Sequence, residues 1–136
     1  MENLKKILID GEYTCVLSDG NEFITSKERG VKPLLTLVNQ NANLKNFCAA
    51  DKVVGKAAAF LYVLLGVKSV YAITISKYAL SVFQKYNINV TYDIVTDAIL
   101  NRKGDGFCPM ESAVLNIDNP GDALKCINKK TEELKK

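Results

Sequence analysis

Hydrophobic and polar positions alternate along the chain in blocks that predict short strands and helices. Three apolar runs rich in β-forming residues, 47–50, 69–75 and 89–95, are short enough to be buried strands. The blocks between them, 53–65 and 77–86, have the spacing of helices that cover a core. Because strands and helices alternate here, the second half of the chain favours a parallel sheet covered by helices.

The first third of the chain predicts a helix, a hairpin and a second helix. Residues 4–9 have amphipathic helical spacing. Two β-type runs, 13–18 and 22–25, flank Asp19-Gly20-Asn21, which is typical of a tight turn and predicts a β-hairpin. Pro33 then precedes another helical block, in whose first turn proline is well tolerated. The hairpin is expected to add antiparallel strands at one edge of the sheet.

The end of the chain predicts two further helices, and the whole pattern predicts one fold. Cys108-Pro109-Met110-Glu111 opens a short helix, and Asn119-Pro120-Gly121-Asp122 starts the last one. We therefore expect an α/β protein: a single domain over residues 1–136, built as a three-layer α/β/α sandwich with a mixed, mostly parallel sheet and an N-terminal β-hairpin.

Composition narrows the chemistry. The 136 residues are 48% hydrophobic and 24% charged, as in one soluble domain, and there is no histidine. Without histidine, Ser-His-Asp and Cys-His catalysis and His-ligated zinc are excluded within this chain. The four cysteines form no C-x-x-C pair, so we predict reduced thiols, no metal and no cofactor. Since residues 1–6 lead into no apolar stretch, a cytoplasmic location is expected.

Charge and hydropathy limit the partners. The net charge of +3 comes from residues 125–136, where five lysines face Glu132 and Glu133, which predicts a solvated basic tail. A nucleic-acid surface would need a basic stripe with arginine or aromatic partners, so no nucleic-acid partner is expected. The apolar run 57–67 is too short to cross a bilayer, which needs about 20 residues, and no membrane partner is expected either.

Several segments resemble a known family. The run 50–59, the strand Val70-Tyr71-Ala72, Asn101-Arg102 and Cys108-Pro109-Met110-Glu111 together resemble a small prokaryotic family of unknown function. The resemblance covers nearly the whole chain and implies a cytidine-deaminase-like fold.

The resemblance does not extend to zinc chemistry. Zinc deaminases carry H-x-E or C-x-E at one helix start and P-C-x-x-C at the next. The corresponding positions are Asp51-Lys52-Val53 and Ser76-Lys77-Tyr78-Ala79, which supply no His, Cys or Glu. We therefore expect the fold without zinc deaminase activity.

Polar residues at the predicted helix starts suggest where a ligand would bind. Strand-to-helix turns gather at the carboxyl ends of parallel strands and direct backbone N–H groups into one crevice. Such a crevice suits a small anionic or nucleotide-like ligand, that is, a nucleotide or another phosphorylated small molecule. As structural alternatives, Asp51 and Ser76 are ordinary N-caps, the lysines are solvated, and Gly55 allows close packing of helix on sheet. The candidate ligand-binding residues are Asp51, Lys52, Lys56, Ser76, Lys77, Asn101, Arg102 and Glu111.

Two alternative functions stay open, and the sequence does not decide whether the protein is an enzyme. Cys108 precedes a helix start, where a dipole favours the thiolate, so it is the candidate catalytic residue of a metal-independent group-transfer enzyme. The other interpretation, which the lack of a histidine partner favours, is that Cys108 belongs to a structural turn. The second alternative is a non-catalytic scaffold or interaction module. Since the helix 53–65 is apolar nearly all round, its cover is either the chain's own elements or a homodimer partner.

Overall fold

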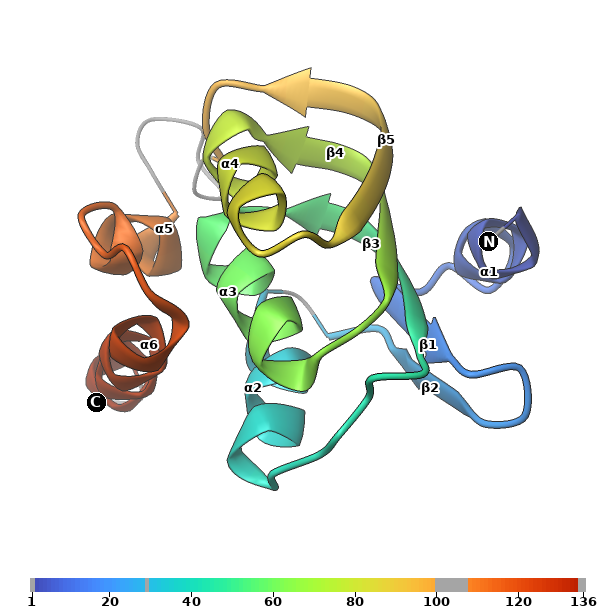
Figure 1. Ribbon diagram of the computed structural model, residues 1–136, viewed down its shortest axis with the longest axis horizontal. Helices are drawn as coiled ribbons and strands as arrows, with labels where there is room; N and C mark the ends of the chain where they lie inside the picture. The colour runs from blue at the N-terminus through green and yellow to red at the C-terminus, as the bar shows by residue number, and fades with distance from the viewer. Residues whose placement is uncertain (1, 29, 100–107, 135–136) are drawn as a thin grey trace.

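Five strands form one mixed sheet in the order β2-β1-β3-β4-β5 in the computed structural model, which describes residues 2–28, 30–99 and 108–134 (Figure 1). The strands are β1 (Cys15–Ser18), β2 (Phe23–Ser26), β3 (Cys48–Val54), β4 (Ser69–Ser76) and β5 (Asn89–Thr96). β1 pairs antiparallel with both β2 and β3, whereas the β3–β4 and β4–β5 pairs are parallel. The expectation of a mostly parallel sheet is therefore wrong, because the hairpin joins β3 through a second antiparallel pairing.

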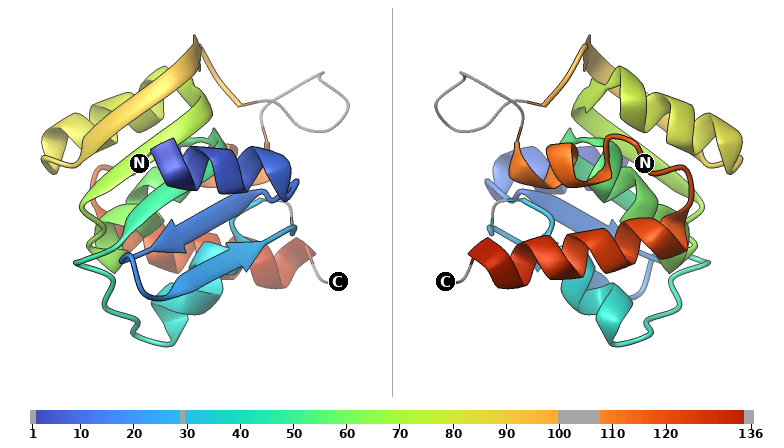
Figure 2. Two further views of the ribbon diagram at one scale, coloured as in Figure 1. Left: turned by 90° about the vertical axis from the view of Figure 1, so that its right-hand side faces the viewer. Right: turned by 90° about the vertical axis from the view of Figure 1, so that its left-hand side faces the viewer.

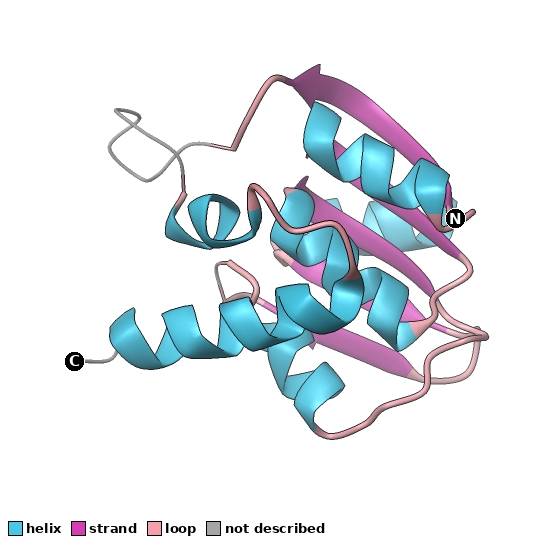
Figure 3. Ribbon diagram, turned by 60° about the vertical axis from the view of Figure 1, so that its left-hand side comes forward, coloured by secondary structure: helices cyan, strands magenta, loops and turns pink. Residues whose placement is uncertain are grey.

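Helices lie on both faces of this sheet, which confirms the α/β class. α1 packs against β1 and β3 on one face, and α2, α3 and α4 lie on the other (Figures 1 and 2). α5 and α6 pack against α3 on the side away from the sheet, so they add a further layer to the expected three (Figure 3). The helices are α1 (Glu2–Asp10), α2 (Lys32–Asn39), α3 (Lys56–Leu65), α4 (Lys77–Lys85), α5 (Pro109–Val114) and α6 (Pro120–Leu134).

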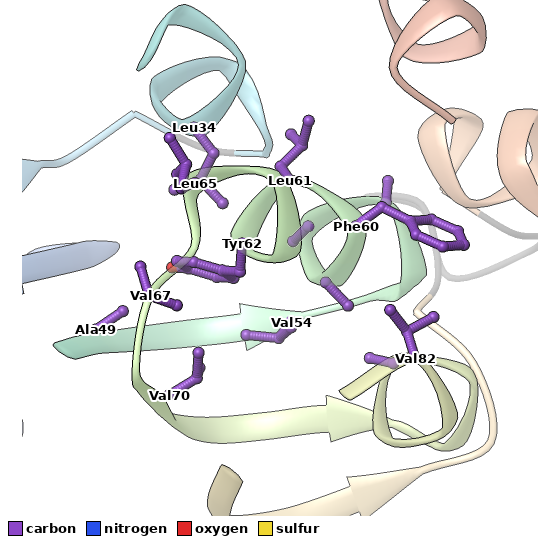
Figure 4. Packing of buried hydrophobic residues seen from close by; sticks show 14 of the residues in the cluster. Leu34, Ala49, Val54, Phe60, Leu61, Tyr62, Leu65, Val67, Val70 and Val82 are labelled. Atoms are coloured by element: carbon purple, nitrogen blue, oxygen red, sulfur yellow. The ribbon is translucent and has the colours of Figure 1, made fainter. Parts of the chain in front are cut away.

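Helix α3 is the centre of the hydrophobic core. Leu61 and Leu65 lie toward Leu34 of α2, while Phe60 extends from another side of α3 (Figure 4). Each large apolar side chain buried in this way contributes roughly 2 kcal/mol to folding. α3 ends at Gly66, whose φ of 78° is the left-handed conformation that glycine adopts most readily at a helix end. The buried residues of α3 are Ala57, Ala58, Ala59, Phe60, Leu61, Tyr62 and Leu65.

The boundary between β3 and α3 differs from the expectation. The sequence pattern placed an N-cap at Asp51 and a helix from residue 53, but β3 continues through Asp51 to Val54, and Gly55 is the N-cap of α3. Asp51 pairs in register with Ala72 of β4, and Val54 pairs with Ile75. The strand tolerates a buried aspartate because its carboxyl group finds a hydrogen-bond partner on α3.

The lysine-rich end of the chain is also more ordered than expected. Residues up to Leu134 belong to α6, and Ile127 within this stretch is fully buried. The described part of the expected basic tail 125–136 is therefore helical: α6 packs an apolar side against α3, while Lys125 and Lys129 are exposed. No helix in the described ranges is both long and apolar enough to span a membrane.

Candidate functional site

The start of α3 is closed by a carboxylate from α5. Glu111 Oε1 accepts a hydrogen bond from the backbone N–H of Lys56 at 2.5 Å, and Oε2 accepts one from Ala57 at 2.9 Å. These N–H groups have no partner within the helix, and the helix dipole also favours a negative group there. Burial raises the pKa of Glu111, while the two N–H donors offset part of that rise.

A lysine of α3 in turn caps the end of α5. Lys56 Nζ donates a hydrogen bond to the carbonyl oxygen of Leu115, the C-cap residue of α5, at 2.8 Å. α3 and α5 therefore cap one another. Gly55 makes this possible, because a Cβ atom at that position would overlap the Glu111 carboxylate. We call this set, Gly55, Lys56, Glu111 and Leu115, the α3–α5 clamp.

The start of α4 lies beside the start of α3. Because β3 and β4 are parallel and Val54 pairs with Ile75, the turns that follow the two strands leave the sheet at the same end, the carboxyl end of its parallel strands. Ser76 is the N-cap of α4, as predicted, and its hydroxyl accepts a hydrogen bond from the N–H of Ala79 at 3.1 Å. Lys77 Nζ forms a salt bridge of 2.7 Å with Asp97, which follows β5, and both side chains are largely exposed.

Asp51 is turned into the core instead of the crevice. Its Oδ2 accepts a hydrogen bond from the Tyr62 hydroxyl at 2.6 Å, and its Oδ1 accepts one from the N–H of Val53 at 3.2 Å. Burial raises the pKa of Asp51 to about 7, and these hydrogen bonds offset part of the effect. Burial, followed by the charge of Asp51, raises the pKa of Cys15 to about 12. This arrangement favours a structural role for Asp51, which joins β3 to α3.

The other candidate residues fall into three groups. Lys52 is exposed within β3 instead of lying at a helix start. Cys108 is half-buried at the start of α5, and its side chain makes no capping hydrogen bond. Asn101 and Arg102 lie outside the described residues. The structure therefore brings together Lys56, Ser76, Lys77 and Glu111 from the predicted set.

Two residues of this region were missed at the level of sequence. Asp97 forms an ion pair with Lys77. Its position could have been found from the sequence, because it directly follows a parallel strand and residues there lie near the start of the helix that follows the neighbouring strand. Tyr62 is the partner of Asp51; a tyrosine in an otherwise apolar helix indicates a buried hydroxyl that needs a hydrogen-bond partner, although it does not indicate which one.

Within the described residues, no group of three or more Cys, Asp and Glu side chains is placed to hold a metal ion.

Comparison with known proteins identifies the family. The family model described as "TM1506: Domain of unknown function (DUF1893)" matches residues 3–131. The chain belongs to this family. It is also similar to the crystal structure of a DUF1893 family protein, TM1506, from Thermotoga maritima, with a TM-score of 0.89 and 29% sequence identity over 95% of this chain and 88% of that one. No curated protein sequence matches the chain significantly.

In this DUF1893 domain the starts of α3 and α4 each already hold a carboxylate of the chain itself. Glu111 lies on the N–H groups of α3, and Asp97 lies on the ammonium group of Lys77. The two contacts differ in strength, because the Glu111 contact is buried and multidentate whereas the Asp97 contact is an exposed ion pair. The N–H groups of Lys56 and Ala57 at the α3 start are therefore covered by a buried carboxylate, whereas at the α4 start Lys77 and Asp97 are both largely exposed.

The α3–α5 clamp gives a stability prediction. We expect Glu111→Ala to lower the free energy of unfolding by about 2 kcal/mol, because two helix N–H groups lose their acceptor. Gly55→Ala is expected to cost a similar amount, since the new methyl group displaces the same carboxylate. Urea denaturation of the two single variants and the double variant tests this. The double variant should be little worse than either single one; fully additive losses would show that the two residues act independently.

The buried Asp51 carboxyl gives a pH prediction. Its pKa is about 7 in the folded protein and 3.8 in a model peptide, so the native state binds this proton more tightly than the unfolded chain. The stability that protonation confers is present below the unfolded pKa and is lost as the pH rises toward 7, with a slope of up to about 1.4 kcal/mol per pH unit. Urea denaturation from pH 5 to about 8 measures it.

Asp51→Asn should remove most of this slope, whereas Asp118→Asn, at an exposed site between α5 and α6, should leave it in place. An unchanged slope in Asp51→Asn would contradict the assignment.

Proposed function

We propose that this DUF1893 domain binds a small anionic or nucleotide-like ligand at the start of α4. One observation carries the proposal: the chain's own carboxylates already lie at the two places where an anion would be stabilised. A phosphate group offers the same chemistry as a carboxylate toward backbone N–H groups and lysine.

The ligand binds at α4 in preference to α3. Glu111 is buried and held by two backbone donors, so replacing it would also open the α3–α5 clamp. Asp97 is held by one exposed ion pair, and such pairs contribute little, about 0 to 1 kcal/mol. An incoming phosphate therefore replaces Asp97 on Lys77 at low cost. Ser76 takes up only the N–H of Ala79, and a helix start has further N–H groups without an intrahelical partner.

The finer structural expectations remain part of this proposal. The cytidine-deaminase-like fold remains what the sequence resemblance implies, because the matching family model describes only a domain of unknown function. The corrected start of α3, Gly55-Lys56-Ala57, again supplies no His, Cys or Glu side chain, which supports a function without zinc deaminase chemistry. A cytoplasmic location stays a prediction from the sequence, and the four cysteines form no disulfide with one another.

The alternative of a group-transfer enzyme keeps one observation in its favour. Cys108 lies three residues before Glu111, in the turn that leads to the α3–α5 clamp, and its thiol is not used as a cap. Its disadvantage is that Glu111, the described acidic residue nearest in sequence that could serve as a base, is already engaged by two N–H donors. Binding at Lys77 is therefore the better-supported function.

A ligand panel tests the proposal. We expect saturable thermal stabilisation by inorganic phosphate or by one of the mono-, di- and triphosphates of the common ribonucleosides. Lys77→Ala should weaken that binding about tenfold, because it removes the cation that meets the phosphate. Lys125→Ala, an exposed lysine on α6, is the matched control and should bind normally. A panel without any saturable shift, or equal binding by the two variants, would refute the site.

A further inference from the structure

β5 is an edge strand whose outer side has no partner strand in the described part of the chain. It spans eight residues and pairs only with β4, so its outward N–H and C=O groups are left for another strand. The opposite edge, β2, spans only four residues. β5 is therefore the longer of the two places where the sheet can be extended.

The side chains of β5 are unusually apolar for an exposed edge. Tyr92, Ile94 and Val95 are 44%, 56% and 43% exposed. Ile94 shares a row with Val53 through the β4 strand between them, and Val53 is 46% exposed as well. Natural edges are commonly protected by proline, lysine or an inward charge, and β5 contains neither proline nor lysine.

The one charge of β5, Asp93, is partly balanced within the chain. Asp93 Oδ2 accepts a hydrogen bond from the Tyr71 hydroxyl at 2.5 Å, and Oδ1 lies 3.7 Å from the ammonium nitrogen of Lys5 on α1. These two contacts offset part of the Asp93 charge, so the carboxylate opposes an approaching strand mainly where a second carboxylate lies directly opposite it.

The interior helix does not need an external partner. The sequence left open that a second subunit covers the apolar helix 53–65, but α3 is enclosed by the sheet, α2, α4, α5 and α6. Of the nine large apolar side chains that are exposed in the described part of the chain, three lie together on β5: Tyr92, Ile94 and Val95.

We propose that β5 pairs antiparallel with β5 of a second copy of this chain, so that the two five-stranded sheets become continuous across a two-fold axis. The unpaired backbone groups require an extended strand as the occupant, and the sequence of β5 complements itself. In the register centred on Tyr92, this residue faces the partner's Tyr92, and positions equally far before and after it face one another. Val90 then faces the partner's Ile94, and Thr91 faces the partner's Asp93.

Most pairs in this register join apolar with apolar or polar with polar side chains, which stabilises cross-strand neighbours; the exception is Asn89, which faces the partner's Val95. The neighbouring register, centred on Asp93, would place two carboxylates opposite one another and is disfavoured. The pairing does not depend on ligand binding at α4.

Sedimentation equilibrium of the full chain over a micromolar concentration series tests the proposal. We expect a dimer mass for the wild type. Tyr92→Lys should weaken the dimer at least about tenfold, because two lysines then face each other at the axis. Thr91→Lys should tighten it, because the new ammonium meets the partner's Asp93. Phe23→Lys, a change of an equally exposed apolar residue on the opposite edge strand β2, is the matched control and should dimerise like the wild type.

Two further measurements guard against a trivial result. Circular dichroism establishes that each variant is folded, as the exposure of the substituted residues leads us to expect. Amide hydrogen exchange of the wild type should show protection at β5 that rises with protein concentration. A monomer at every concentration, a dimer insensitive to Tyr92→Lys, or β5 exchange independent of concentration would overturn the proposal.

Discussion

Helix α3 has almost no polar face, and this constraint organises the rest of the protein. Seven of its ten residues are buried, so it needs apolar neighbours on nearly every side. The sheet covers one side, and α2, α4, α5 and α6 cover the others. Side chains from other elements meet two of its polar needs: Glu111 accepts from the N–H groups of Lys56 and Ala57, and Asp51 accepts from the hydroxyl of Tyr62.

These two solutions decide which of the chain's polar residues remain for a ligand. Asp51 is committed to the core, and Glu111 and Lys56 are committed to the α3–α5 clamp. The start of α4 keeps an exposed cation, Lys77, whose partner Asp97 is also exposed. The helix that must be buried is therefore also the helix whose first N–H groups are covered, which is why the proposed binding site is placed at the start of α4.

Local signals predicted the elements, whereas the long-range contacts were not predictable. The strand 69–75, the N-cap Ser76 and the hairpin around Asp19-Gly20-Asn21 were found because period, capping and turn chemistry are local properties. Asp51 was misassigned because an aspartate before an apolar run resembles an N-cap, and only the distant Tyr62 hydroxyl makes it stable in a strand. The mostly parallel sheet failed for the same reason, since the sequence does not reveal where β1 docks.

The central claim of the proposal is that an anion binds at the start of α4 and not at the start of α3, where Glu111 already occupies the N–H groups. Backbone amide NMR during titration with inorganic phosphate and with ATP tests it most directly, because each helix start reports separately. The account predicts saturable chemical-shift changes at Lys77, Tyr78 and Ala79, with the amides of Lys56 and Ala57 unmoved because Glu111 holds them. Shifts centred on Lys56 and Ala57, or no saturable shift at the start of α4, would contradict it.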